Sequence, residues 1–188
     1  FGDTVLYLWQ RGELRVLHGT QLDARAPGAT PPLSGIVAGH LTPAGLLLAC
    51  ALFDDAYGLA YLPLDAPGDP RPVAVTGQAH TGFGELDRLE HLDGDRFMVG
   101  YNIDGCAWLY EGRFDEGAPA MRLGRVLCGG GELAGGVAEG PRYDAESGTL
   151  ALAFSTATTP TQLYTVRAGQ TRRHTRERVL GIPDTNLS

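Results

Sequence analysis

Four of the seven tyrosines recur at nearly equal spacing, and this repeat constrains the fold more than any other feature of the chain. Tyr7, Tyr61, Tyr110 and Tyr164 follow one another at separations of 54, 49 and 54 residues. Each lies in a short apolar run, which is the third run of its repeat. A period of about 50 residues with about four strands per unit is typical of the blades of a β-propeller.

The apolar runs have the length and pattern of β-strands. Leu150, Leu152 and Phe154 alternate with small residues at period two, and a second β-rich run follows Pro160. The 27 glycines and 12 prolines separate such runs along the whole chain. No stretch longer than about ten residues has convincing helical periodicity. The sequence therefore predicts an all-β fold.

Strands are expected in four sets. The first set is incomplete and comprises residues 3–9 and 13–17. The second comprises residues 35–41, 46–53, 57–64 and 73–76. The third comprises residues 85–92, which could also form one or two helical turns, and residues 97–101, 106–110 and 121–127. The fourth comprises residues 137–143, 149–155, 163–166 and 170–175.

These sets predict a partial β-propeller of about three four-stranded antiparallel blades plus an incomplete first blade. The expected units are residues 1–19, 20–78, 79–131 and 132–178, followed by a linker at residues 179–188 that leaves the last unit. A single β-sandwich is the alternative, although it would not require the tyrosines to be in phase. Because the chain begins in a run that reads as a strand, we expect it to be part of something larger.

Charge and composition exclude several classes of function. The net charge of −7 opposes binding to nucleic acid and to anionic lipid surfaces. All 15 basic residues are arginines, so Schiff-base chemistry and a phosphate-loop lysine are excluded. No apolar run reaches the ~20 residues that span a bilayer, and no signal peptide is present. A soluble, cytoplasmic protein is expected.

The sequence predicts no metal or other cofactor. Cys50, Cys106 and Cys128 are far apart and are expected to be small apolar core residues. The five histidines have no metal-ligand spacing: His18, His40, His80, His91 and His174. Asp93 and Asp95 flank Gly94 in what reads as a hairpin turn rather than a calcium loop.

The polar residues of the first strand of each blade are candidates for binding. In a propeller these innermost strands line the central channel. Channel side chains could hold a peptide terminus or filter entry by charge, and the candidates are His40, Asp87, Glu90, Glu139 and Arg142. The same side chains would also suit solvated channel or edge positions. The basic residues at positions 172–178 could clasp an acidic partner, or could protect an exposed edge strand.

The loop from Ser155 to Pro160, followed by Gln162, Leu163 and Tyr164, resembles a signature of the last propeller blades in the prolyl oligopeptidase family. That signature is S-x-x-x-x-P-x-x-(I/L)-(Y/W), and the family includes the acylaminoacyl and dipeptidyl peptidases. Residues 171–188 look like the family's exit from the propeller, and the rest of the chain is similar only in blade rhythm. The resemblance implies a propeller that caps an α/β-hydrolase domain with a Ser-Asp-His triad.

The chain departs from the family in lacking a nucleophile elbow. Ser34, Ser147, Ser155 and Ser188 all lack the flanking glycines that allow this strained turn. We therefore expect a non-catalytic propeller portion of a serine peptidase, gating peptide access to a hydrolase domain outside this chain. The expected partners are that domain, peptide substrates and further copies of the chain through open blade edges. The alternatives are a free-standing binding or scaffold propeller and a hydrolase using channel carboxylates such as Glu90 and Glu139.

Overall fold

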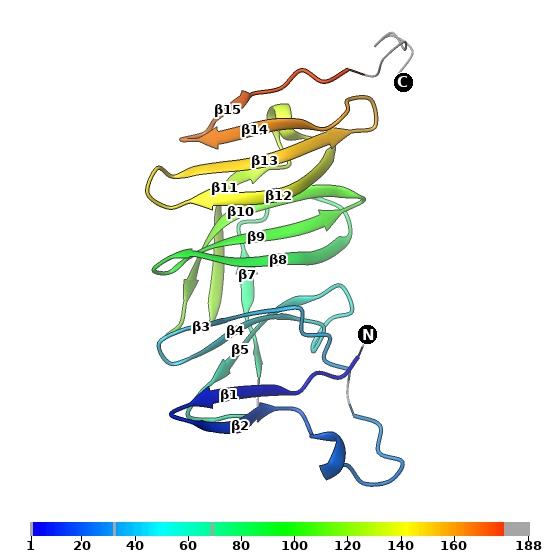
Figure 1. Ribbon diagram of the computed structural model, residues 1–188, viewed down its shortest axis with the longest axis vertical. Helices are drawn as coiled ribbons and strands as arrows, with labels where there is room; N and C mark the ends of the chain where they lie inside the picture. The colour runs from blue at the N-terminus through cyan, green and yellow to red at the C-terminus, as the bar shows by residue number, and fades with distance from the viewer. Residues whose placement is uncertain (1, 32, 69, 179–188) are drawn as a thin grey trace.

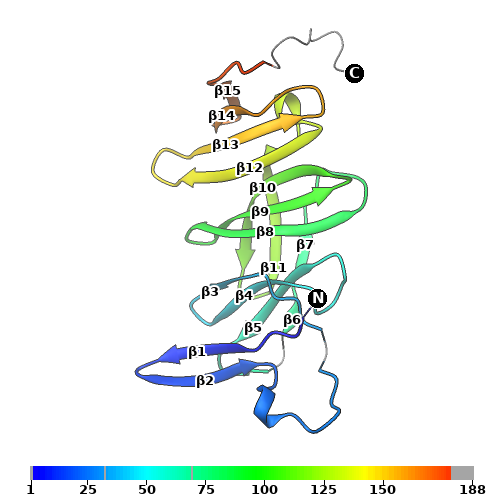
Figure 2. The same cartoon turned by 45° about the vertical axis from the view of Figure 1, so that its right-hand side comes forward.

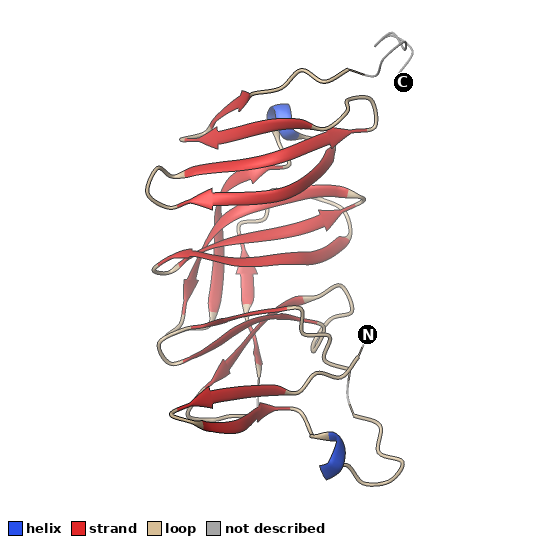
Figure 3. Cartoon of the chain, viewed as in Figure 1, coloured by secondary structure: helices blue, strands red, loops and turns tan. Residues whose placement is uncertain are grey.

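The computed structural model describes residues 2–31, 33–68 and 70–178, and its regular structure there is almost entirely β-strand (Figure 3). The strands are β1 (Leu6–Gln10), β2 (Glu13–His18), β3 (Ala38–Leu41), β4 (Gly45–Cys50), β5 (Gly58–Pro63), β6 (Arg71–Pro72), β7 (Ala74–Thr76), β8 (Gly84–Asp93), β9 (Arg96–Ile103), β10 (Cys106–Asp115), β11 (Ala120–Cys128), β12 (Gly136–Asp144), β13 (Thr149–Thr156), β14 (Gln162–Arg167) and β15 (Gln170–Arg173). Two 3₁₀ helices, η1 (Leu22–Ala24) and η2 (Gly131–Leu133), are one turn long. Within the described ranges, no helix is long and apolar enough to cross a membrane.

The strands form four sheets that follow chain order. β1 and β2 form a two-stranded sheet, and the next sheet has the order β3-β4-β5-β6. The third sheet has the order β7-β11-β10-β9-β8, and the fourth has the order β12-β13-β14-β15. Figures 1 and 2 show the sheets following one another along the longest axis, from β1 and β2 at one end to β15 at the other. The strand predicted at residues 85–92, rather than a helical turn, is confirmed as β8.

Successive sheets pack face to face, which gives the molecule three hydrophobic cores. One core joins β1 and β2 to the second sheet, one joins the second sheet to the third, and one joins the third to the fourth. On β4, Leu47 and Ala49 belong to the second core, whereas Leu48 and Cys50 belong to the first. Side chains alternate between the two faces of a strand, so a strand buried on both faces reads as a continuous apolar run.

This double burial distinguishes the fold from a single sandwich, in which each sheet would bury one face only. The second and third sheets contribute to two cores each, and the first strand of each of the last three sheets lies at an edge. The architecture is an all-β partial propeller, as the repeat predicted.

The linker predicted at residues 179–188 lies outside the described residues.

The tyrosine repeat is confirmed at the level of strands, and the structure adds the direction of each side chain. Tyr61, Tyr110 and Tyr164 lie on β5, β10 and β14, which correspond to the third expected strand of each set. Tyr110 and Tyr164 pack against the preceding sheet, whereas Tyr61 packs against the following one. Tyr7 lies on β1, on the face opposite Leu6 and Leu8.

Most of the segment expected as the fourth strand of the second set, residues 73–76, lies instead in the third sheet as β7, and β6 takes the fourth place in the second sheet. Arg71 and Pro72 pair with β5, and β7 then pairs in parallel with β11 of the next sheet. Proline has no backbone N–H and cannot extend a ladder on both sides. Gly77 follows at φ 86°, and an added Cβ would lie 2.1 Å from the carbonyl oxygen of Leu123. The chain therefore leaves β7 close against β11 at a position where only glycine fits.

The cysteines occupy the positions expected of small core residues. Cys50 and Cys128 are buried, Cys106 is half-buried, and all three are free thiols. Burial raises the pKa of the Cys50 thiol and raises that of Cys128 to about 12. Both thiols are consequently protonated and unreactive near neutral pH.

Candidate functional site

The five predicted channel residues all lie on first strands at sheet edges. His40 lies on β3, Asp87 and Glu90 on β8, and Glu139 and Arg142 on β12. Each of these strands is paired on one side only, with β4, β9 or β13. Among the described residues, no hydrogen bond or ion pair joins any two of the five. They are therefore spread over three sheets and do not form one cluster.

The structure gives each of the four charged candidates a different environment. Asp87 occupies a β-bulge between Leu86 and Arg88, and desolvation raises the pKa of its carboxyl group although part of the residue is exposed. The carboxylate of Glu90 lies 3.5 Å from Arg88 Nη1. Glu139 and Arg142 are exposed on the last sheet, where Arg142 donates to the carbonyl of Pro141.

His40 is brought into contact with a second histidine that the sequence did not single out as its partner. The imidazole rings of His40 and His91 are stacked with their centroids 4.0 Å apart and their planes at 17°. Phe97 meets both rings edge-on, at 5.3 Å and 5.1 Å. The two histidines are 51 residues apart, which is one repeat. The repeat period was therefore the signal that could have paired them.

The histidine pair lines a pocket of about 400 Å³ between the turns of neighbouring sheets. Its apolar lining includes Leu41, Pro43, Phe97 and Phe114, and Thr42, Asp95 and Glu116 also line it. The β3–β4 turn, the β8–β9 turn and the start of the β10–β11 turn all contribute. We refer to this hollow as the histidine pocket. Its size suits one large side chain rather than a folded partner.

Glu116 fixes the rim of the histidine pocket. Its Oε1 accepts hydrogen bonds from the Tyr61 hydroxyl at 2.8 Å, the Ala44 backbone N–H at 3.1 Å and the Thr42 hydroxyl. Burial acts to raise the pKa of Glu116, but these donors outweigh it and lower the pKa overall. Burial and the bond to Glu116 raise the pKa of Tyr61 to about 12. Glu116 thus ties two turns together and stays ionised.

The electrostatics of the pocket favour the neutral form of His40. Burial, followed by the neighbouring His91, lowers the pKa of His40. The Nε2 atom of His91 lies 3.1 Å from the carbonyl oxygen of Gly94, which fits a proton donated from that nitrogen. Asp95, at the same turn, is held by Arg113 at 2.6 Å. The pocket can therefore offer aromatic faces to an apolar side chain.

The histidine pocket has no arrangement for covalent catalysis. Thr42 supplies the one hydroxyl group among its described lining residues, and Glu116 already binds that hydroxyl. A nucleophile needs a neighbouring base that can accept its proton. The two histidines instead face each other and Phe97. The geometry supports binding and does not support acyl transfer.

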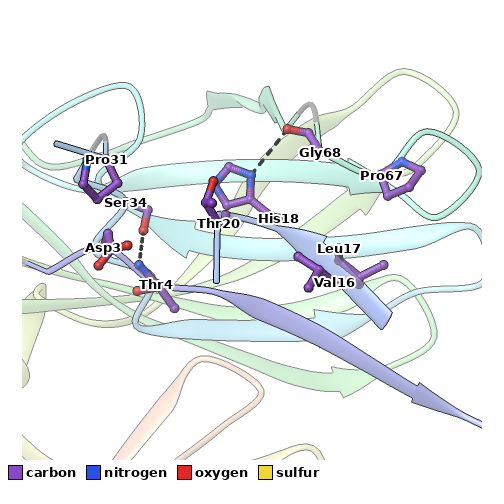
Figure 4. A pocket seen from close by; sticks show the side chains of 11 residues that line it. Asp3, Thr4, Val16, Leu17, His18, Thr20, Pro31, Ser34, Pro67 and Gly68 are labelled. Carbon is purple, nitrogen blue, oxygen red and sulfur yellow. Dashed lines mark hydrogen bonds between the residues drawn. The ribbon is translucent and has the colours of Figure 1, made fainter. Parts of the chain in front are cut away.

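A second pocket, of about 440 Å³, brings together a serine, a histidine and an aspartate (Figure 4). Ser34 is buried, and its Oγ accepts the backbone N–H of Thr4 at 2.7 Å. His18 Nδ1 lies 3.4 Å from the carbonyl of Gly68, and Asp3 forms an ion pair with Arg25. None of these interactions links the serine to the histidine or the histidine to the aspartate. The pocket therefore lacks the hydrogen-bond relay of a triad.

The hairpin turn predicted at residues 93–95 is confirmed between β8 and β9. Asp93 pairs with Arg96, and Asp95 pairs with Arg113. Arg96 also reaches Glu111 at 3.2 Å, and Glu111 binds Arg125 at 2.7 Å. These contacts use the carboxylates of the turn in ion pairs within the third sheet.

The motif that resembled the peptidase family forms the β13–β14 connection and the start of β14. Gln162 is 1% exposed, and its Oε1 accepts the Thr175 hydroxyl and the Glu177 backbone N–H, each at 2.9 Å. Its Nε2 donates to the carbonyl of Glu177 at 2.8 Å. One buried amide therefore fastens the segment that leaves the last sheet.

The fold and its pockets define the chain as a partial β-propeller with a side-chain-sized pocket at its first strands. No protein-family model matches the sequence, and no curated protein is significantly similar to it. Among solved structures, the fold is similar to that of a prolyl endopeptidase, one of two analysed for the role of inter-domain dynamics in catalysis and specificity. The TM-score is 0.60 at 14% sequence identity, over 92% of this chain and 23% of that one. The chain thus spans less than a quarter of that protein's length.

Proposed function

We propose that the chain is a non-catalytic propeller portion of a prolyl-oligopeptidase-like serine peptidase, and that it gates peptide access to a hydrolase domain outside these residues. Two observations support this proposal independently. The fold is similar to that of a prolyl endopeptidase. The sequence from Ser155 to Tyr164 also resembles the last-blade signature of the same family. Because one fold can serve many functions, peptide binding has to be inferred from the geometry of the site.

The histidine pocket is the observation that carries the peptide-binding part of the proposal. It lies where the first strands of two consecutive sheets, β3 and β8, reach their turns. Such a position suits contact with an extended peptide that passes along the innermost strands. The lining of Phe97, Phe114 and the stacked histidines would accept one apolar side chain of that peptide.

Binding can be tested with the chain itself. Apolar peptides of about ten residues should shift the amide resonances around His40, His91 and Phe97 in a heteronuclear correlation spectrum. The His40→Ala variant should raise the dissociation constant about tenfold, because it removes one wall of the pocket. His174→Ala, in the segment after β15, is the matched control and should leave binding unchanged. Equal affinity of both variants would contradict a role for the histidine pocket.

The peptidase context needs a separate test. The coding sequence beyond the codon for Ser188 should contain a G-x-S-x-G nucleophile elbow, and the isolated chain should not hydrolyse peptide esters. A stop codon soon after Ser188 would instead favour a free-standing binding module. The completeness of the histidine pocket within two sheets of this chain supports that second candidate.

A further inference from the structure

The histidine pocket is lined by carboxylates and by no arginine among the described residues. Asp95 and Glu116 both line it. Asp95 is already paired with Arg113, which approaches from outside the lining at 2.6 Å and 2.9 Å. Glu116 forms no ion pair within the described ranges, and its hydrogen bonds come from uncharged groups. The pocket therefore contains one ionised carboxylate without a counter-ion.

Only one oxygen of the Glu116 carboxylate is occupied. The donors from Thr42, Ala44 and Tyr61 all bind Oε1. In the part of the chain that the structure describes, no hydrogen bond reaches Oε2. An ionised carboxylate offers about two acceptor sites on each oxygen. Oε2 therefore keeps its capacity to accept a hydrogen bond from a ligand.

The surrounding residues hold this carboxylate in one position. Gly45 leaves space for the ring of Tyr61, which a Cβ at that residue would overlap. The Tyr61 hydroxyl reaches Glu116 at 2.8 Å, and the Thr42 hydroxyl also accepts the backbone N–H of Gly45 at 3.1 Å. Because Glu116 is already ordered, a ligand that binds Oε2 does not have to immobilise it.

Aromatic rings form the walls beside Glu116. The rings of Phe97 and Phe114 lie 6.3 Å apart with their planes at 89°, and Phe97 also contacts His40 and His91. Aromatic rings attract cations through the negative charge of their faces. A guanidinium group is planar and weakly hydrated, so it stacks on such rings. Aromatic walls beside an unpaired carboxylate therefore suit an organic cation.

We propose that the histidine pocket binds an arginine side chain of a peptide, with the guanidinium group donating to Oε2 of Glu116. This inference rests on the peptide-binding function proposed above and names the residue that the pocket selects. The methylene stem of arginine is apolar and suits the contacts offered by Phe97 and Phe114. A lysine ammonium group is more strongly hydrated and has no planar face to stack. The net charge of −7 also favours the approach of a basic peptide.

The test compares three peptides that differ only at one central residue, which is arginine, citrulline or lysine. Citrulline has nearly the shape of arginine but carries no charge. In isothermal titration calorimetry with the wild-type chain, the arginine peptide should bind about tenfold more tightly than the citrulline peptide. The lysine peptide should bind more weakly than the arginine peptide. Added salt should reduce the advantage of arginine, because it screens a charge pair that water can reach.

A pair of variants assigns the preference to Glu116. Glu116→Gln should weaken binding of the arginine peptide about tenfold and leave binding of the citrulline peptide within about twofold of wild type. Unchanged binding of the citrulline peptide also shows that the variant keeps its pocket. Asp115→Asn is the matched control, because it removes the same charge from a neighbouring side chain that does not line the histidine pocket. It should retain the preference for arginine.

The outcomes separate this inference from the proposed function. Equal affinity for the arginine and citrulline peptides overturns the inference and leaves peptide binding in place. A preference that survives Glu116→Gln, or that is lost equally in Asp115→Asn, also overturns it. A lysine peptide that binds as tightly as the arginine peptide overturns the assignment to guanidinium. If none of the three peptides binds, the proposed peptide binding fails together with the inference.

Discussion

Tyr110 combines the repeat position with a local role in holding a loop. Its side chain is fully buried, and its hydroxyl accepts the backbone N–H groups of Ala79 and His80 at 3.2 Å and 3.1 Å. The same hydroxyl lies 2.7 Å from Nδ1 of His80, whose pKa is lowered by burial. The hydroxyl can therefore donate to a neutral His80 while it anchors the segment between β7 and β8.

We predict that Tyr110→Phe destabilises the fold by about 1 to 3 kcal/mol, because it leaves two partly buried N–H groups without an acceptor. Urea unfolding followed by circular dichroism measures the change. Tyr7→Phe is the matched control, since the Tyr7 hydroxyl accepts one 3.3 Å bond from the exposed Gln21. It should cost less than about 0.5 kcal/mol. Equal losses of unfolding free energy in the two variants would show that the hydrogen bonds of the Tyr110 hydroxyl do not stabilise the fold.

We predict that Glu116 makes stability depend on pH. Its folded pKa is lowered, so its contribution is complete above its ordinary value of 4.5 and is lost as the pH falls through the folded pKa. Glu116→Gln keeps an acceptor oxygen but removes the charge, and we expect a loss of about 1 kcal/mol at pH 7. Wild type and variant should converge as the pH falls through the lowered pKa of Glu116. Urea unfolding at pH 7, 5 and 3 tests this, and a constant difference would contradict it.

At the scale of elements, β4 shows how one strand serves two cores. Leu47 and Leu48 are neighbours and are both 0% exposed, yet Leu47 packs toward the third sheet and Leu48 toward the β1–β2 hairpin. In a strand with one solvated face, one of the two would be exposed. The pair therefore provides a matched test of the face-to-face stacking.

We predict that Leu47→Ala and Leu48→Ala each cost about 2 to 5 kcal/mol, through a lost side chain and the cavity that remains. Their local effects should differ. Leu48→Ala should speed hydrogen exchange in β1 and β2, whereas Leu47→Ala should leave that hairpin close to wild type, relative to each variant's global stability. Hydrogen exchange with mass spectrometry resolves the two regions. The same response of the hairpin to both substitutions would contradict the separation of the cores.

At the scale of the whole molecule, each sheet contacts its neighbours in the chain, as in other repeat proteins. Within the described residues, the second and third sheets are covered on both faces, whereas the first and last are covered on one. We therefore predict that native-state hydrogen exchange is slowest in β4, β9 and β10 and fastest in β1 and β2. Uniform protection across all four sheets would indicate one cooperative unit instead.

Much of this architecture could be read from local patterns. Alternation in Leu150, Leu152 and Phe154 predicted β13, and turn residues such as Gly94 and Gly105 predicted the hairpins around β9. The spacing of Tyr61, Tyr110 and Tyr164 placed each in the third expected strand of its set, and these strands are β5, β10 and β14. These signals are local because strand pairing across a short turn depends on residues close together in the chain.

The sequence by itself determined that this chain forms successive small sheets, because period-two alternation and turn chemistry act within a few residues. Tertiary structure alone decided which sheet each face meets, since Tyr61 and Tyr110 point in opposite senses from equivalent strands. It also decided that His40 stacks on His91, which depends on how two sheets lie against each other. Strand patterning fixes the two faces of a sheet, whereas the partner of each face depends on packing between residues about 50 positions apart.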